Sequence, residues 1–426
     1  MKNLNFQNLI LYQLPILLIT GLPLFLITGP FLSDLTVSIT ILIFIYISLK
    51  EKKYEYYNTK FFKIFIIFWL YLVINSLLQY PDFYSFQTTF FYFRHGIFVL
   101  ALWYFLKINN NLIKYIFYSM LLCFLILVID GFHQYFFGEN FFGIKIQEEY
   151  RISSFFGDEL ILGSYLSRLF PIFFGLSFLL NYKNKHFFIY GILFVLIEVL
   201  IFLSGERTAF FNLNLSAIFM ILMLNNLKLF RTIVLSASFL LIILISNFDN
   251  SAKERVLDQT INQMNYGDYD TKKYVFSEQH EHHYISALKM FKDNIVLGVG
   301  VKNFRNYCDD KRYNVSYLSC STHPHNTYIQ FLSEIGILGF IFLIYSLLIF
   351  SFHSFKHLIW QIKKKIYMNN FEICLLSSIL ITIWPIVPSG NFFNNWLSIV
   401  YYFPVGFLLY SLEKKMKNKK KIRKIY

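Results

Sequence analysis

The stretch FFIYGILFVLIEVLIFLSGERTAFFNLNLSAIFMILML, residues 187–224, decides the fold class of this chain. Its two apolar runs, 187–204 and 208–224, are each about as long as one helical crossing of a lipid bilayer. Only Gly205, Glu206 and Arg207 separate them. The stretch therefore predicts two membrane-spanning helices joined by a tight turn, and a single kinked unit is the alternative interpretation.

The composition of the whole chain extends this prediction. Of the 426 residues, 56% are hydrophobic and 15% are charged, whereas about a quarter of a soluble domain is charged. The 52 Phe and 31 Tyr exclude an intrinsically disordered chain, and the four Cys exclude a disulfide-rich secreted scaffold. The first apolar run, residues 9–27, is too long for the core of a removable signal peptide. We therefore expect an all-α polytopic membrane protein that forms a single integral membrane domain over residues 1–426.

Twelve stretches are apolar over about 18 or more residues, which sets the expected number of transmembrane helices. Their expected limits are 8–29, 31–49, 61–79, 89–106, 112–130, 161–180, 187–204, 208–224, 230–247, 327–350, 371–389 and 392–412. An even number of spans places both ends of the chain on the same side of the membrane.

Lysine and arginine residues set the expected orientation, because short cytoplasmic loops retain them and translocated loops do not. One set of alternate connections contains Lys50, Lys52, Lys53, Lys60, Lys63, Lys107, Lys114, Lys183, Lys185, Lys228, Arg231, Lys356, Lys363, Lys364 and Lys365. In the opposite set, residues 80–89 and 388–396 have no basic residue. We therefore expect both termini in the cytoplasm. The polybasic cytoplasmic tail, 413–426, is expected to bind anionic lipids and no nucleic acid.

Two of the expected outer connections are long, and they cover residues 131–160 and 248–326. The second has roughly 80 residues, and a loop of that size is usually structured and functional. We expect it to form a large extracytoplasmic subdomain. Within it, Tyr284, Ala287, Leu288 and Phe291 repeat at helical spacing, which predicts an amphipathic helix. This helix is expected either to lie on the membrane surface or to cover the loop's own core.

Half of the ten histidines lie in this one loop, namely His280, His282, His283, His323 and His325. Such clustering raises the hypothesis of a metal site. The sequence HEHH, residues 280–283, does not supply a complete zinc ligand set, and closed structural sites favour CxxC or HxxxH spacing. We therefore expect no metal, and imidazoles that face solvent or substrate.

The segment STHPHNTYIQ, residues 321–330, carries the most chemical information. It predicts Ser321 or Thr322 as an N-cap and Pro324 in the first helical turn, so His325 and Asn326 would lie at a helix N-terminus. Such an end favours an anion and keeps a nearby imidazole neutral, as a general base requires. The alternative is a polar cap whose His and Tyr anchor the span at the interface.

Arginines on the side that otherwise lacks positive charge form a second group of candidates. Arg207 lies in the outer turn and Arg305 in the long loop, and each is expected either to hold a phosphate or to form a local contact. Four charged residues lie within apolar spans, and for these we expect internal pairs or a polar cavity. They are Arg94, Arg168, Glu198 and Glu334.

Two further features of the loop concern its structure. Cys308 and Cys320 lie twelve positions apart in the outer loop, and in an oxidising compartment this predicts a disulfide. The sequence LGVGV, residues 297–301, resembles a dinucleotide-binding fingerprint only superficially, because the third Gly is missing and no βαβ unit surrounds it. It is expected to be a turn packed close to backbone, so the sequence predicts no nucleotide cofactor.

The order of these motifs resembles that of the O-antigen ligase and O-antigen polymerase family. The resemblance rests on SGERT at 204–208, ALKMFKDNIVLGVG at 287–300, NFR at 303–305 and HNTYIQFLSEIGILG at 325–339, and it covers about residues 190–350. It implies a bacterial inner-membrane protein of about twelve spans with one large periplasmic loop.

The resemblance also implies metal-independent glycosyl transfer from an undecaprenyl-diphosphate-linked glycan to a sugar hydroxyl of lipid A core or of a growing glycan. By motif, His325 would act on the acceptor hydroxyl, while Arg207 and, less directly, Arg305 would hold the donor diphosphate. His323 and Asn326 are further candidate substrate-binding residues. Many family members have an Arg and a Trp where this chain has EHHY, residues 281–284, so His282 or His283 is expected to substitute for that Arg.

Two other classes of function remain as alternatives. One is a transporter of polysaccharide or lipid-linked sugar, for which inverted repeats and broken helices at mid-depth are typical. The chain shows no clear repeat between its halves, and its candidate residues lie at the outer surface. The other alternative is a membrane receptor or scaffold whose outer loop binds a partner.

Overall fold

The computed structural model of the protein describes residues 8–79, 82–146, 151–180, 184–248, 253–258, 261 and 276–423. These ranges contain helices and turns but no β-strand, apart from one isolated bridge between Glu139 and Lys145. The main helices are α2 (Leu14–Phe25), α3 (Pro30–Lys50), α4 (Lys60–Leu78), α5 (Phe83–Phe91), α6 (Phe93–Ile108), α7 (Leu112–Phe137), α8 (Leu162–Leu179), α9 (Asn184–Leu203), α10 (Arg207–Met223), α11 (Lys228–Phe248), α14 (Glu278–Asp293), α15 (Phe304–Tyr307), α16 (Thr327–Ile362), α17 (Asn370–Ile383) and α18 (Asn395–Arg423). Short turns of other helix types cover Leu9–Gln13, Tyr54–Tyr57, Ser154–Phe156 and Glu254–Asp258.

Within the described ranges, nine helices are long and apolar enough to cross a membrane. They are α3, α4, α5 continued by α6, α7, α8, α9, α11, α16 and α18. Three shorter apolar helices cover Leu9–Phe25, Arg207–Met223 and Asn370–Ile383. Each of the twelve apolar stretches of the sequence coincides with one of these helices. The all-α polytopic fold is therefore confirmed, while the number of twelve spans stays a prediction.

Some helix ends differ from the expected limits. Helix α7 continues to Phe137, seven residues beyond the expected end at 130, so the long connection that follows it is shorter than expected. Helix α17 ends at Ile383 instead of 389, because Pro385 lacks an N–H and disfavours helical backbone at Trp384. Helix α18 continues through the basic tail as far as Arg423.

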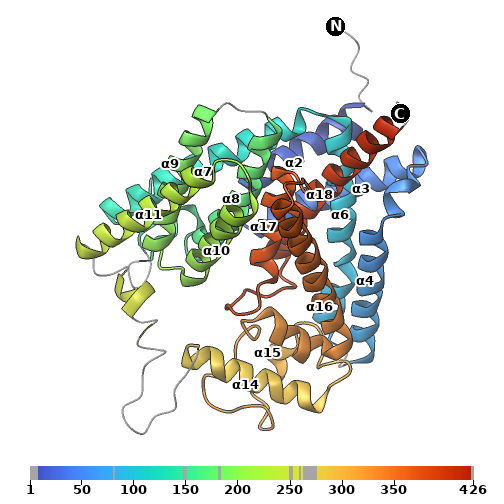
Figure 1. The fold of residues 1–426 in the computed structure, drawn as a ribbon. Coiled ribbons are helices and arrows are strands. Elements are labelled where there is room, and N and C mark those ends of the chain that lie inside the picture. The colour runs from blue at the N-terminus through green and yellow to red at the C-terminus, as the bar shows by residue number, and fades with distance from the viewer. Residues whose placement is uncertain are drawn as a thin grey trace.

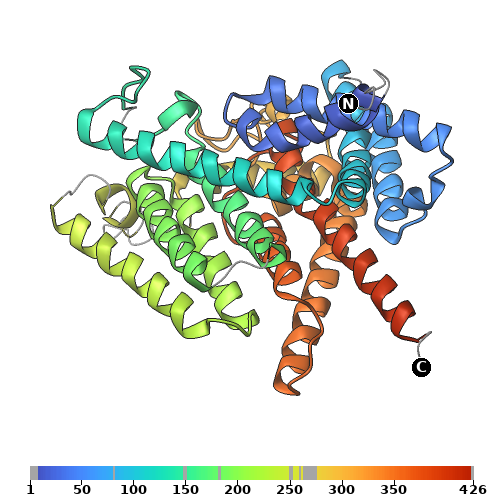
Figure 2. The ribbon, with the colours of Figure 1, turned by 90° about the horizontal axis from the view of Figure 1, so that it is seen from above.

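Figures 1 and 2 show how the helices are arranged. Helix α6 packs along α18, α8 along α17, α2 along α7, and α9 along α11. Helices α14 and α15 lie together at one end of the bundle, beside the start of α16 and away from the end of α18 (Figure 1). We call the end that carries α14 and α15 the loop face. Many large apolar side chains point outward from the helices, as lipid contact requires, and Phe31 on α3 is 73% exposed.

The four charged residues within apolar spans all have partners in the described part of the chain, but these partners are not one another. Arg94 pairs with Asp34 at 3.0 Å, and the Arg168 guanidinium lies 5.2 Å from the ring centre of Tyr401. The Glu198 carboxylate accepts a hydrogen bond of 2.6 Å from the Ser238 hydroxyl, and the Glu334 carboxylate accepts one of 2.9 Å from the Gln330 amide. The expected internal pair is thus observed for Arg94, while Arg168, Glu198 and Glu334 have aromatic or polar neighbours.

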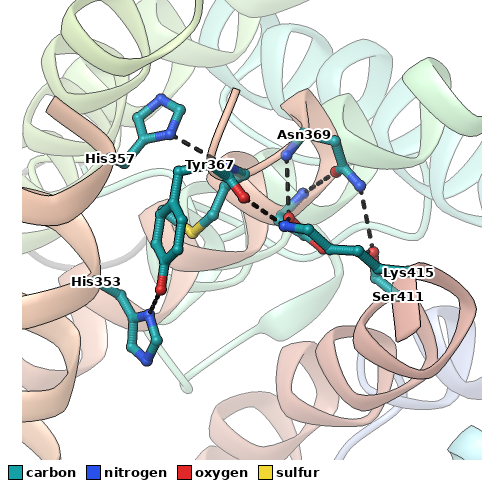
Figure 3. Close-up of polar contacts among 8 residues, drawn as sticks. His353, His357, Tyr367, Asn369, Ser411 and Lys415 are labelled. Carbon is teal, nitrogen blue, oxygen red and sulfur yellow. Dashed lines mark hydrogen bonds and ion pairs between the residues drawn. The ribbon is translucent and has the colours of Figure 1, made fainter. Parts of the chain in front are cut away.

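At the end opposite the loop face, polar contacts join α16, α17 and α18 (Figure 3). Tyr367 donates to or accepts from His353 at 2.6 Å, and its carbonyl accepts from Lys415. The buried carboxylate of Glu372 accepts from Ser411 at 3.1 Å and forms an ion pair with Lys415 at 3.4 Å. These contacts fix the start of α17 against α18.

Helix α16 is broken at Gly336, and a loop segment fills the break. Gly336 has φ of 62° and non-helical ψ of −170°. Residues 295–300 run alongside, and the N–H groups of Val299 and Gly300 donate to the carbonyls of Ser333 and Glu334 at 2.8 Å. Across the break, Ile337 N–H donates to the Ile295 carbonyl at 2.8 Å. The backbone groups freed by the break are therefore satisfied by the loop, as a helix interrupted within a protein requires.

This arrangement explains the glycines of LGVGV. Gly298 has φ of 69°, and a Cβ built on it would lie 2.4 Å from the backbone carbon of Glu334. Asn75 and Tyr71 of α4 donate to the carbonyls of Leu297 and Ile335 and so fasten both sides of the contact. The expectation of a turn packed close to backbone is confirmed.

Helix α14 corresponds to the predicted amphipathic helix. Its Ala287 and Met290 are buried with Val299, Phe304 and other residues of the loop, and the helix also packs against α16. Of the two readings, the structure favours a helix that covers the loop's own core.

We predict that Gly298→Ala lowers the thermal unfolding midpoint well below that of wild type. The added methyl overlaps the Glu334 backbone, which should cost about 1–3 kcal/mol on top of the strain of a left-handed residue. Gly143→Ala is the matched control, because Gly143 has φ of 78° and no atom within 4 Å of a built Cβ. Equal midpoints for the two variants, measured by tryptophan fluorescence in detergent, would contradict the close backbone contact.

Candidate functional site

Helix α16 begins at Thr327, four or five residues after the start that an N-cap at Thr322 or Ser321 implies. Its N-cap is Asn326, whose Oδ1 accepts from the N–H groups of Tyr328 and Ile329 at 2.9 and 3.1 Å. The expectation of Ser321 or Thr322 as N-cap is therefore wrong. Asparagine is among the strongest N-caps, and its position directly before the apolar run satisfies the first free N–H groups. The Asn326 Nδ2 also donates to the Pro385 carbonyl at 2.9 Å, which ties this helix start to the end of α17.

His325 precedes this cap in a strained conformation. Its φ is 56°, in the left-handed region that residues other than glycine seldom adopt. Its carbonyl accepts from the Ser389 N–H at 2.8 Å, and its Nε2 lies 2.9 Å from the Ser321 hydroxyl. Strained residues held by several surrounding contacts are common at functional sites.

Four imidazoles gather at this point, and we call them the histidine cluster: His280, His283, His323 and His325. The ring centre of His325 lies 4.1 Å from that of His323 and 5.3 Å from those of both His280 and His283. His325 is thus the centre of the cluster. His280 and His283 come from α14, one turn apart, whereas His323 and His325 come from the segment before α16.

The members of the cluster differ in their hydrogen bonds. His323 is held at both nitrogens, by the Thr322 hydroxyl at 2.9 Å and the Ser389 carbonyl at 3.0 Å. His280 Nδ1 contacts the Ser277 hydroxyl at 2.9 Å. His283 is fully buried, and within the described residues neither ring nitrogen meets hydrogen-bond geometry. His282 lies outside the cluster, with its Nδ1 2.8 Å from the Ser316 hydroxyl.

Burial keeps the cluster uncharged. Burial, followed by the neighbouring His323, His280 and His283, lowers the pKa of His325 to about 3. Burial likewise lowers the pKa values of His280 and His323 to about 4, and that of His283 below its usual range. The sequence-based expectation of a neutral imidazole before α16 agrees with these directions, although burial and not the helix end is the main cause.

The charges of two arginines act on histidines of the cluster. The charge of Arg207 contributes to the low pKa of His280, and that of Arg305 to the low pKa of His323. Arg207 begins α10 after Glu206, whose carboxylate accepts from the Gly163 and Ser164 N–H groups at the start of α8. Each arginine therefore acts electrostatically on a histidine whose ring lies near that of His325.

Arg305 is held in place by two neighbours. Its Nη2 donates to the Thr322 carbonyl at 3.2 Å, and its guanidinium lies 5.6 Å from the ring centre of Tyr84 on α5. Lys302 approaches the same ring at 4.7 Å. Two cations therefore approach one aromatic ring.

Cys308 and Cys320 form a disulfide of 2.11 Å at the base of this segment. It joins α15 to the residues that lead into His323, so it limits the movement of the histidine cluster relative to the loop. Their sulfurs and an Asp309 carboxylate oxygen lie within 4.8 Å of one another, the kind of group that can hold a metal. Because the two sulfurs are bonded to each other, this group lacks the thiolates that a metal requires.

Sequence reasoning missed two residues of the site. His280 was considered only for a metal site and not as a catalytic or substrate-binding residue, although its spacing of three and seven positions from His283 and Ala287 places all three on one helical face. Arg151 was missed because it is distant in sequence. Its positive charge lowers the pKa of Arg207 and also lowers the pKa of Glu206. Burial raises that Glu206 pKa to about 7.

We predict that the histidine cluster contributes stability that is lost as the pH falls from about 7 to about 5. The cluster histidines bind protons in the unfolded chain near their usual pKa of 6.5 but resist protonation when folded, so unfolding takes up protons across this range. His280→Gln should reduce the slope of the unfolding midpoint against pH. His282→Gln, on the same helix but outside the cluster, should keep it, and an equal change in both variants would contradict the assignment.

Residues 192–344 match a family model described as O-Antigen ligase. A search of curated proteins finds no match. The matched range includes Arg207, Arg305, the histidine cluster and the break of α16 at Gly336. Such a match supports a role in O-antigen or other polysaccharide biosynthesis and an enzyme of the ligase or polymerase class. The resemblance seen in the motifs is confirmed for residues 192–344, which are similar to the O-antigen ligase family.

Proposed function

We propose that the protein transfers a glycan from undecaprenyl diphosphate to a sugar hydroxyl, with His325 as the catalytic base. The observation that carries this proposal is the position of His325. It is a neutral imidazole with a strained backbone at the centre of four histidines. Its ring lies near those of His280 and His323, whose pKa values are lowered by the charges of Arg207 and Arg305 respectively. A neutral imidazole beside two guanidinium groups suits a proton acceptor next to an anionic leaving group.

The proposed reaction is a single displacement. In one tautomer of His325, Nε2–H donates a hydrogen bond to the Ser321 hydroxyl, and the lone pair lies on Nδ1. Within the described residues, no group forms a hydrogen bond to this Nδ1. Nδ1 takes the proton of the acceptor hydroxyl, and the oxygen forms a bond to the anomeric carbon. The bond from that carbon to the diphosphate breaks, and undecaprenyl diphosphate leaves with its charge held by Arg207 and Arg305. The proton then passes from His325 to the leaving group or to water.

With its low pKa, His325 is a weak base before the donor binds. A base with a pKa of about 3 accepts a proton poorly at neutral pH, because the best base has a pKa near the working pH. A bound diphosphate adds negative charge beside the cluster and offsets the two arginines, and both effects raise the pKa of the imidazole. We therefore propose that the donor activates the base when it binds.

The same proposal assigns the surroundings of the reaction. The protein would lie in the bacterial inner membrane with both termini in the cytoplasm and with residues 248–326 as a periplasmic loop. The acceptor would be lipid A core, in a ligase, or a growing glycan, in a polymerase. His283 and His323 would shape the site around His325, and Asn326 would position it. The basic end of α18 would contact anionic lipids.

We predict that His325→Asn abolishes transfer from a purified lipid-linked donor while preserving or raising the unfolding midpoint. Removing a general base lowers the rate by about 10²–10⁴-fold. Asparagine tolerates the left-handed backbone better than most residues, so a purely structural histidine would leave activity intact. His133→Gln is the matched control, because His133 contacts only the backbone of Glu139 among its hydrogen-bond partners in the described residues. Activity of His325→Asn equal to that of the control would contradict the proposal.

We also predict that Arg305→Gln raises the KM for the donor by about tenfold or more, through loss of a charge-assisted contact to phosphate. Arg312→Gln is the matched control in the same loop, since Arg312 is exposed and pairs with Asp310 at 2.7 Å. An equal KM for the two variants would exclude Arg305 from the donor site. In cells, a deletion that leaves a single repeat unit on the lipid indicates a polymerase, whereas loss of all capped lipopolysaccharide indicates a ligase.

A further inference from the structure

Polar side chains near the end of α7 hold the segment that carries Arg151. The Gln134 Oε1 accepts hydrogen bonds from the N–H groups of Ser153 and Ser154 at 3.0 and 2.7 Å. The Ser154 hydroxyl donates to the Asp130 carboxylate at 2.5 Å. Both Asp130 and Gln134 are buried, although they belong to an apolar helix. Buried polar groups of α7 therefore fix the position of Arg151 in the connection between α7 and α8.

Arg168 approaches the same region from the second turn of α8. Its side chain is buried, and the residue is 5% exposed. The Arg168 Nε donates to the Ser164 hydroxyl at 3.3 Å, and the Ser164 N–H donates to the Glu206 carboxylate at 3.0 Å. Arg168 therefore lies close to the turn that precedes α10.

Glu206 brings these two arginines together with Arg207. Burial raises the pKa of Glu206, whereas the charges of Arg151 and Arg168 lower it. Burial, followed by the charge of Arg151, lowers the pKa of Arg207, the next residue in the chain. Three guanidinium groups from three segments of the chain therefore act on one turn. We call Arg151, Arg168 and Arg207 the arginine group.

Two members of the arginine group have hydrogen-bond donors that the described residues do not use. A guanidinium has five N–H donors. In Arg151 and Arg168 together, only the Arg168 Nε–H forms a hydrogen bond with a described residue. The Arg151 Nε and the Arg168 Nη1 are buried without a partner there. Buried donors and charges without partners cost free energy, so the stability of the fold does not explain this arrangement.

The charges in this region favour an anionic ligand. The Glu206 carboxylate is the negative group that acts on both Arg151 and Arg168, and it already accepts from the Gly163 and Ser164 N–H groups. One negative charge therefore faces two positive ones. The planar fork of a guanidinium matches the oxygens of a phosphate group. Phosphate oxygens would occupy the unused donors and balance the remaining charge.

Resting on the proposed function, we infer that Arg151 and Arg168 join Arg207 in binding the diphosphate of the donor. A diphosphate has several oxygens and more than one negative charge, so it can use donors that a single carboxylate leaves free. The charge of Arg207 also acts on His280, which places this diphosphate site beside the histidine cluster. Asp130 is then a positioning residue, because it holds the segment that carries Arg151.

The test measures binding of undecaprenyl diphosphate to the purified full-length protein in phosphatidylcholine nanodiscs. Arg151→Gln and Arg168→Gln should each raise the Kd by about tenfold or more, through loss of charge-assisted contacts to phosphate. Inorganic pyrophosphate should compete with the lipid, and phosphatidylglycerol should not. Lys145→Gln is the matched control, because it removes an exposed cation from the same connection and should bind like wild type.

The unfolding midpoint separates binding from a structural role. Arg151→Gln removes a cation that forms no hydrogen bond with the described residues, so the ligand-free variant should unfold at the wild-type midpoint or above it. A lower midpoint together with an unchanged Kd overturns the inference. Competition by phosphatidylglycerol equal to that by pyrophosphate also overturns it. If Arg168→Gln does not fold, the result for Arg151→Gln decides.

A double-mutant cycle tests the positioning role of Asp130. Asp130→Asn should raise the Kd in the wild-type background and leave it unchanged in the Arg151→Gln background, because both variants act through the same guanidinium. Additive effects overturn this role. Weakened binding in the arginine variants, with no glycan transfer by the wild type, supports the inference and contradicts the proposed function. Glycan transfer by the wild type, with the Kd unchanged in both variants, does the reverse.

Discussion

The candidate site depends on the insertion of residues 295–300 into the break of α16 at Gly336. Backbone groups of the two segments of α16 form hydrogen bonds with backbone groups of the loop here. Without these bonds, the polar backbone groups of the helix and of the loop would be buried without partners. The contact permits no side chain at Gly298, because the Glu334 backbone lies too close. The contact thereby fixes the position of the loop relative to the helix bundle. Helices α14 and α15 lie directly before and after residues 295–300 in the chain.

From this attachment follows the geometry of the histidine cluster. Helix α14 brings His280 and His283 to the start of α16, where Asn326 and Ser389 hold His325 in a left-handed conformation. Burial keeps the rings neutral, while the charges of Arg207 and Arg305 leave the region suited to an anion. A basic residue kept uncharged beside fixed positive charges is a state that only the assembled loop can maintain.

Much of this fold could be predicted from the sequence, because apolar stretches and turn residues report directly on helices. The twelve stretches all coincide with helices, and LGVGV was correctly expected to pack against backbone. The helix break itself was not foreseen, since Gly336 within an apolar run gives no local sign of a loop inserting beside it. His325, Arg207 and Arg305 were found from motifs. His280 and Arg151 were not, because their place in the site depends on tertiary packing.

The most direct test of the central claim is the pH dependence of glycan transfer, analysed separately for kcat/KM and kcat. The first reports the free enzyme and the second the enzyme with bound donor. Our account predicts that kcat/KM stays level from pH 8 to about 5, since His325 remains neutral there, whereas kcat falls at a higher pH because the bound diphosphate raises the imidazole pKa. If both parameters instead fell together with an apparent pKa near 6.5, the usual value for histidine, the buried neutral cluster would not be the catalytic base.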